Sequence, residues 1–133
     1  MTDMSNSPIG KPLQRREDYR FLTGAGQYTD DVVLPGQTFG YFLRSPHAHA
    51  RIKSIDTSKA AKAAGVVQIF TGADLAEAKV GGLPCGWLIH SKDGSPMKEP
   101  PHPIIAHDKV RHVGDQVALI VAETYLQAKD AAE

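Results

Sequence analysis

The fold is decided by Gln116-Val117-Ala118-Leu119-Ile120-Val121-Ala122, a stretch that Thr124-Tyr125-Leu126-Gln127 follows after one intervening residue. The first stretch predicts a strand, and its wholly apolar part is far shorter than the roughly 20 residues that cross a bilayer. The second stretch has the form of a capping box, which predicts a helix with Tyr125, Ala128 and Ala132 on one face. The sequence therefore predicts a strand that a helix closely follows.

This helix has no stop signal within the chain. Neither glycine nor proline follows it before Glu133, although such residues commonly end helices. Its length of about ten residues is also below the roughly 12 to 15 that make an isolated helix even marginally stable. We therefore expect the chain to be a piece of a larger subunit, cut in its last helix at Ala131-Ala132-Glu133.

Further strands are expected upstream, in short runs rich in aromatic or β-branched residues. Residues 48–53 alternate alanine or isoleucine with basic side chains, which is the period of a strand with one buried face. Gly114-Asp115 supplies a turn signal between the last two strands. The expected strands are residues 39–44, 48–53, 66–70, 109–113 and 116–122.

Short helices and one long loop are expected between these strands. A polar residue at 56–58 can cap a helix over residues 59–64, which Gly65 would close. Residues 79–103 mix glycines and prolines with other residues, which predicts a long ordered loop of the kind that often contacts a partner. Other short helical turns are expected at residues 15–22 and after the capping residue Thr71.

Composition narrows the class of protein. The 133 residues are 41% hydrophobic and 23% charged, close to the average of soluble globular domains. Fifteen lysines and arginines balance fifteen aspartates and glutamates. Because no net field then attracts a polyanion, nucleic acid and anionic membranes are disfavoured as partners.

The start of the chain predicts an extended lead-in and a cytoplasmic location. Residues 1–13 are polar with two prolines, and we expect them to order only against a partner surface. The start has neither the basic nor the apolar region of a secretory signal, so a cytoplasmic location is expected. Cys85 is the single cysteine and cannot form an internal disulfide, which agrees with a reducing compartment.

The clearest metal-binding signal is His47-Ala48-His49. Alternate positions of a strand point to one face, so the two imidazoles could bind a single ion. A third ligand is missing at short spacing, and a structural or interface role is therefore favoured over a metal site. The remaining histidines lie far along the chain, at His90, His102, His107 and His112.

Two other candidate sites lie near the start of the chain. Gly24-Ala25-Gly26 begins like a dinucleotide loop, but Thr29 stands where the third glycine belongs and no strand precedes it. A glycine turn that allows close approach of two backbones explains it better. Asp30-Asp31 cannot flank one bond as an acid–base pair, because neighbours on an extended chain point to opposite faces. Capping or interface roles are favoured.

Cys85 is a weak candidate for a nucleophile. Its setting, Pro84-Cys85-Gly86-Trp87 with His90 nearby, shows neither a positioned base nor a cause for a lowered pKa. Trp87 and Met97 in the same loop are better explained as anchors against a neighbouring subunit or domain.

Several stretches together resemble the start of the large, molybdenum-binding subunit of the xanthine dehydrogenase and aldehyde oxidase family. Their order and spacing match from about Ile9 to the last residue, and the loop 85–98 is most similar to the aerobic carbon monoxide dehydrogenase type. The matching stretches are Arg16-Glu17-Asp18, Arg20-Phe21-Leu22-Thr23-Gly24, Gly26-x-Tyr28-x-Asp30-Asp31, Leu34-Pro35-Gly36, Arg44-Ser45-Pro46-His47-Ala48-His49-Ala50-Arg51-Ile52 and Val113-Gly114-Asp115-x-Val117-Ala118.

The resemblance implies an α+β fold, the α/β hammerhead, over residues 14–133. In this fold a mixed β-sheet carries two or three helices packed on it. The domain would frame the active-site entrance and the subunit contacts of the parent enzyme. It would bind no cofactor itself, and no catalytic, cofactor-binding or metal-binding residue is assigned within the chain.

The resemblance also implies the chemistry of the parent, a molybdenum hydroxylase acting on carbon monoxide, an aldehyde or an N-heterocycle. Molybdopterin cytosine dinucleotide and a catalytic glutamate would lie beyond Glu133. Water would supply the oxygen, and electrons would pass through [2Fe-2S] clusters to FAD on partner subunits. Cys85 does not correspond to the copper-bearing cysteine of carbon monoxide dehydrogenases.

Other functions stay open from the residues alone. A free-standing module could hold a protein or a metal with the His47/His49 strand and the Trp87 loop. A metallohydrolase built on the histidines is a more distant alternative. The fragment is also expected to self-associate, because surfaces that normally meet other domains would be exposed.

Overall fold

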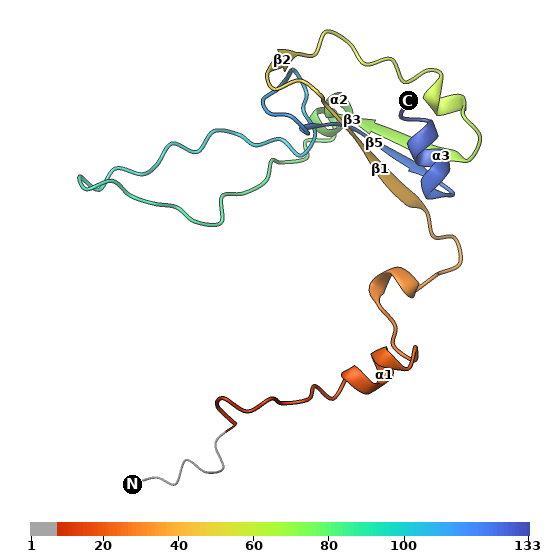
Figure 1. Ribbon diagram of the computed structural model, residues 1–133. Coiled ribbons are helices and arrows are strands. Elements are labelled where there is room, and N and C mark those ends of the chain that lie inside the picture. Colours follow the sequence, from red (N-terminus) through yellow and green to blue (C-terminus); the bar gives the residue numbers. More distant parts are fainter. Residues whose placement is uncertain (1–7) are drawn as a thin grey trace. The chain divides into compact units, whose positions relative to one another are not determined.

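The strand predicted at residues 116–122 is present as β5 (Gln116–Ala122) in a computed structural model, which describes residues 8–133. β5 lies in the middle of a three-stranded sheet, between β1 (Phe39–Arg44) and β3 (Val66–Thr71). Both pairs are antiparallel. Figure 1 shows the three strands side by side, with α3 next to them.

One face of this sheet forms the core with α3 (Tyr125–Asp130). Every second residue of β5 points to this face, and Ile120, opposite Tyr41 and Ile69, is only 2% exposed. Burial of a side chain of this size contributes about 1.5–3 kcal/mol. The buried members of the core cluster are Ala118, Ile120, Ala122 and Ala128.

The predicted start of α3 at Thr124 is confirmed, but only the N-cap half of the predicted capping box is formed, because the Gln127 side chain bonds the Thr124 hydroxyl rather than its backbone N–H. The Thr124 hydroxyl accepts a hydrogen bond from the Gln127 backbone N–H at 3.2 Å and donates one to the Gln127 side chain at 2.9 Å. Ala128 is buried and Ala132 packs against the core, as expected. Tyr125 lies at the rim of this face, 51% exposed, with its ring edge-on to Tyr41 at 5.8 Å.

A second, two-stranded sheet pairs β2 (Ala50–Arg51) with β4 (Lys109–Val110), also antiparallel. Both strands are shorter than the predicted residues 48–53 and 109–113. β4 ends at Val110 because the next backbone N–H, that of Arg111, donates to the Asp115 carboxylate. This N–H is therefore not available to pair with a neighbouring strand. Gly114-Asp115 is a turn as predicted, but β4 and β5, which it separates, belong to different sheets.

The helix predicted over residues 59–64 is wrong in type and length. The structure has a single 3-10 turn, η3 (Ala60–Lys62), there. Gly65, at φ +77°, turns the chain straight into β3. The backbone is already extended at Ala63, with ψ 146°, so the turn does not continue into an α-helix.

α2 (Gly72–Glu77) begins after Thr71, as predicted. The Asp74 carboxylate accepts hydrogen bonds from the Thr71 hydroxyl at 2.7 Å and from the Thr71 backbone N–H at 2.6 Å. Gly72 packs against the 106–107 backbone so closely that any side chain there would overlap it. This contact fixes the start of α2 beside the buried residues Ile105 and Ala106.

Residues up to Gly36 form a separate unit from Gln37–Glu133. It contains α1 (Asp18–Leu22) and the 3-10 turn η2 (Thr29–Asp31). The division into a lead-in at residues 1–13 and a domain at residues 14–133 stays a prediction. Residues 1–7, which make up most of the segment considered for a secretory signal, lie outside the described residues.

The α+β class is confirmed, with the helices α1, α2 and α3 and with antiparallel pairing in both sheets. Within residues 8–133, no helix has the length and apolar character needed to cross a membrane.

Candidate functional site

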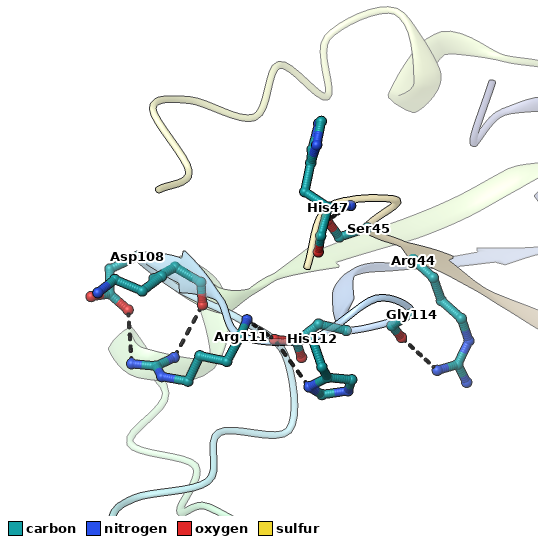
Figure 2. Close-up of polar contacts among 9 residues, drawn as sticks. Arg44, Ser45, His47, Asp108, Arg111, His112 and Gly114 are labelled. Carbon is teal, nitrogen blue, oxygen red and sulfur yellow. Dashed lines mark hydrogen bonds and ion pairs between the residues drawn. The ribbon is translucent and has the colours of Figure 1, made fainter. Parts of the chain in front are cut away.

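Two motifs far apart in sequence meet at the end of β1 and the start of β5. The Ser45 backbone N–H donates to the Asp115 carbonyl at 2.9 Å, and the Gly114 N–H donates to the Ser45 carbonyl at 2.8 Å. Arg44 adds a bond from its guanidinium to the Gly114 carbonyl at 2.9 Å (Figure 2). We call Ser45, Gly114 and Asp115 the Ser45–Asp115 junction.

The Asp115 side chain organises the neighbouring loop. Asp115 is 9% exposed. Its carboxylate accepts a hydrogen bond from the Arg111 backbone N–H at 2.9 Å and lies 3.8 Å from Nδ1 of His112. A buried carboxylate is costly unless it accepts hydrogen bonds. The junction therefore depends on the backbone of residues 111–115 keeping this conformation.

His47 and His49 do not lie on a strand. The Ser45 hydroxyl accepts a hydrogen bond from the His47 backbone N–H at 3.1 Å, which bends the chain before β2 begins at Ala50. The shared-face geometry expected of the two histidines is therefore wrong, and both side chains are exposed. In the part of the chain that the structure describes, no three histidine, cysteine, aspartate or glutamate side chains group closely enough for a metal ion.

Basic side chains surround the junction. Arg111 is 3.8 Å from the Asp108 carboxylate and donates to the Lys109 carbonyl at 3.0 Å (Figure 2). Arg51 and Lys53, on and after β2, are exposed, and within residues 8–133 neither forms an ion pair. The arrangement can hold backbone geometry and attract an anion.

The long loop predicted at residues 79–103 is confirmed and has internal order. Its two ends are joined by a bond from the Leu83 N–H to the His102 carbonyl at 2.8 Å. Near its tip, an isolated antiparallel bridge joins His90 to Pro96. Figure 1 shows the loop as a long two-legged segment, in green and cyan, that leaves the sheets and returns to them.

The loop places Cys85 and the predicted anchors without a catalytic arrangement. The Cys85 thiol lies 3.3 Å from the Trp87 carbonyl, and its backbone N–H donates to Glu99 at 3.1 Å. Trp87 is 78% exposed. Met97 is partly exposed, and its sulfur accepts the Ile89 N–H at 3.5 Å. These contacts order the loop and leave the indole free to contact a partner.

In the first unit, local contacts account for the glycine turn and for the aspartates. Gly26 must lack a side chain because any Cβ there would overlap the Phe21 ring, which stacks on Tyr28 at 4.8 Å. The close approach predicted at this turn is real, but it involves a ring rather than a second backbone. Asp31 accepts the Tyr28 N–H at 2.9 Å, so the capping role favoured for Asp30-Asp31 is confirmed at Asp31.

Sequence reasoning did not identify Ser45 and Asp115 as partners. Arg44 and Gly114 are 70 positions apart, so no local spacing connects them. The available signal was an aspartate after a glycine, Gly114-Asp115, at the entrance of a wholly apolar strand. A carboxylate at such a position has to be satisfied by backbone donors.

Comparison with known proteins identifies the fold that this geometry belongs to. The family model described as aldehyde oxidase and xanthine dehydrogenase, a/b hammerhead domain, matches residues 23–133. The chain belongs to the aldehyde oxidase and xanthine dehydrogenase family. Within it, these residues form the hammerhead domain.

Two relatives in this family are described as a large subunit and a large chain. The chain is 39% identical over 130 residues to the nicotine 6-hydroxylase large subunit of Paenarthrobacter nicotinovorans, covering 98% of the chain and 15% of that relative. It is 42% identical over 125 residues to the carbon monoxide dehydrogenase large chain of Afipia carboxidovorans, covering 94% and 14%. The chain thus spans about one-seventh of the length of these relatives.

A solved structure agrees with these sequence matches. The Cu,Mo-CO dehydrogenase in its carbon monoxide reduced state superposes on the hammerhead domain with a TM-score of 0.72 and 41% identity. The match covers 92% of this chain and 14% of that one. The predicted hammerhead fold is therefore confirmed.

Proposed function

We propose that this hammerhead domain is the structural N-terminal part of a molybdenum hydroxylase large subunit. The observation that carries the proposal is the match of residues 23–133 to the family's hammerhead domain, joined to relatives that are oxidoreductase large subunits. The domain would frame the active-site entrance and contact the other subunits.

We propose that the catalytic reaction takes place in parts of the large subunit other than this domain. Three-residue metal-ligand groups do not occur among residues 8–133, and the Cys85 thiol is directed to a backbone carbonyl. The described residues therefore offer no group of side chains that could ligate a metal ion by themselves. We propose that molybdopterin cytosine dinucleotide is bound elsewhere in the subunit, and that partner subunits hold [2Fe-2S] clusters and FAD in the cytoplasm.

The loop 79–103 is proposed as a subunit- or domain-contact element. Trp87, Leu88 and Ile89 are consecutive and expose 78%, 58% and 60% of their surface. Large apolar and aromatic side chains that cluster on a surface are typical of interface anchors. Because bonds across the loop hold its legs together, little additional ordering would be needed when a partner binds.

The substrate is proposed as carbon monoxide, an aldehyde or an N-heterocycle. The test is reduction of an artificial electron-accepting dye by the complete three-subunit complex with each of these substrate classes in turn. We expect turnover with at least one class. Absence of turnover with every class, in a complex that contains molybdenum, would overturn the proposed redox function.

A further inference from the structure

A hollow of about 380 Å³ lies between the end of β1 and the second sheet. Its walls are largely apolar, from partly or fully buried side chains that include Leu43, Ile52, Val110 and Val117. It opens widely to solvent. An enclosed ligand site would bury most of a small molecule's surface, whereas this hollow would leave much of a small molecule exposed.

The rim of the hollow carries one sign of charge. Arg44, Arg51 and Lys53 line it, and no aspartate or glutamate does. Arg44 donates to a backbone carbonyl rather than a carboxylate. The Asp108 side chain, next to β4, lies against Arg111. In a chain with equal numbers of acidic and basic residues, this is a local excess of cations without counter-charges.

The apolar walls and the cationic rim together indicate which kind of ligand the hollow can bind. Cations at the rim favour an anion through complementarity of charge, which steers association and sets specificity. The apolar walls favour an aliphatic side chain that leaves water. A nucleic-acid backbone would cover these walls with charged phosphates and gain nothing from them, whereas a polypeptide segment supplies both carboxylates and aliphatic side chains.

We propose that this hollow docks an acidic segment of a partner protein, with carboxylates against Arg51 and Lys53 and an aliphatic side chain against Ile52 and Val110. The segment binds in an extended conformation across the mouth of the hollow. This surface is distinct from the Trp87 loop, and the inference goes beyond the proposed function without depending on any redox activity.

The test uses the 133-residue chain and a fluorescent peptide of about ten residues that combines leucine and aspartate, a length that spans roughly 30 Å when extended. Anisotropy at low salt should show saturable binding that weakens as salt rises, because the contacts at the rim are exposed. The Arg51→Glu/Lys53→Glu variant should bind at least roughly tenfold more weakly. Peptides with lysine for aspartate, or serine for leucine, should also bind more weakly.

The matched control is Lys92→Glu/Lys98→Glu, which makes the same change of net charge on the long loop. It should bind the peptide like the unmodified chain. Equal weakening by both double variants, complete displacement by acetate at matched ionic strength, or no saturable binding would each overturn the proposal. Far-UV circular dichroism of both variants ensures that a loss of binding is not a loss of fold, and the milder Arg51→Ala/Lys53→Ala variant replaces any that unfolds.

Discussion

β5 and the loop 79–103 belong to the same unit, yet their apolar side chains have opposite surroundings. Ile120 of β5 is 2% exposed, whereas Trp87 of the loop is 78% exposed. β5 is paired on both edges and covered by α3, while hydrogen bonds such as those from the Cys85 and Ile89 backbone join the loop to itself. The difference indicates that β5 stabilises the domain and that the loop is available for contacts.

The largest expected effect is at the centre of β5. Ile120→Ala should lower the free energy of unfolding by about 2–5 kcal/mol, because it removes buried methyl groups and leaves a cavity. Ile89→Ala, on the loop, removes the same atoms from an exposed position and should change the free energy of unfolding by less than about 0.5 kcal/mol. Urea denaturation of both variants measures the contrast, and similar losses at the two sites would refute it.

The Ser45–Asp115 junction should have the next largest effect. Asp115→Ala leaves the Arg111 N–H without its carboxylate and should cost about 1–3 kcal/mol in chemical denaturation. Asp108→Ala removes an exposed ion pair of 3.8 Å with Arg111 and should cost less than about 1 kcal/mol. If the two variants unfold at the same urea concentration, Asp115 does not stabilise the end of the strand in the way described.

The capping residue of α3 should have a smaller effect. Thr124→Ala removes the acceptor for the Gln127 N–H and should lower the free energy of unfolding by about 1 kcal/mol. Thr124→Ser keeps the hydroxyl and should recover most of that loss. Thermal melts of the two variants distinguish a capping role from the packing of the threonine methyl group, since only the second would leave serine as unstable as alanine.

The smallest expected effect is a change in acid sensitivity. Hydrogen bonds from the Thr71 hydroxyl and N–H hold the pKa of Asp74 below its ordinary value of 3.8. A lowered pKa gives stability that is present above the unfolded-state value and lost as pH falls through the folded-state value. The stability difference between the unmodified chain and Asp74→Asn should therefore shrink below about pH 3.8.

Asp93 provides the comparison on the loop. Hydrogen bonds from the Ser95 hydroxyl and N–H also lower its pKa, but the loop can open locally without unfolding β5. Asp93→Asn should therefore leave the acid limb of global unfolding unchanged. A shift as large as that of Asp74→Asn would show that the loop unfolds together with the core.

The sequence allowed prediction of elements whose signals are local. The strand β5, the N-cap at Thr124 and the proline- and glycine-rich loop were each identified from neighbouring residues. The prediction of a helix over residues 59–64 was wrong because the backbone becomes extended at Ala63, just before the turn at Gly65. Helix propensity alone does not show this change. The metal geometry of His47 and His49 failed because the Ser45 hydroxyl bends the chain there, which alternation alone does not show.

The rest required contacts between distant residues. Asp115 ends β4 and joins Ser45 from across the unit, and no spacing in the sequence encodes that pairing. The cationic hollow likewise combines the segment after β1 with β4. Resemblance to the family supplied the fold but not these contacts.

The central claim is that this hammerhead domain belongs to a molybdenum enzyme without binding the metal itself. Molybdenum content per polypeptide, measured on the purified 133-residue chain and on the complete large subunit in its complex, tests it most directly. We predict about one molybdenum per complete subunit, and none on the chain that exceeds the buffer background. Stoichiometric molybdenum on the chain, or none on the complete subunit, would contradict the claim.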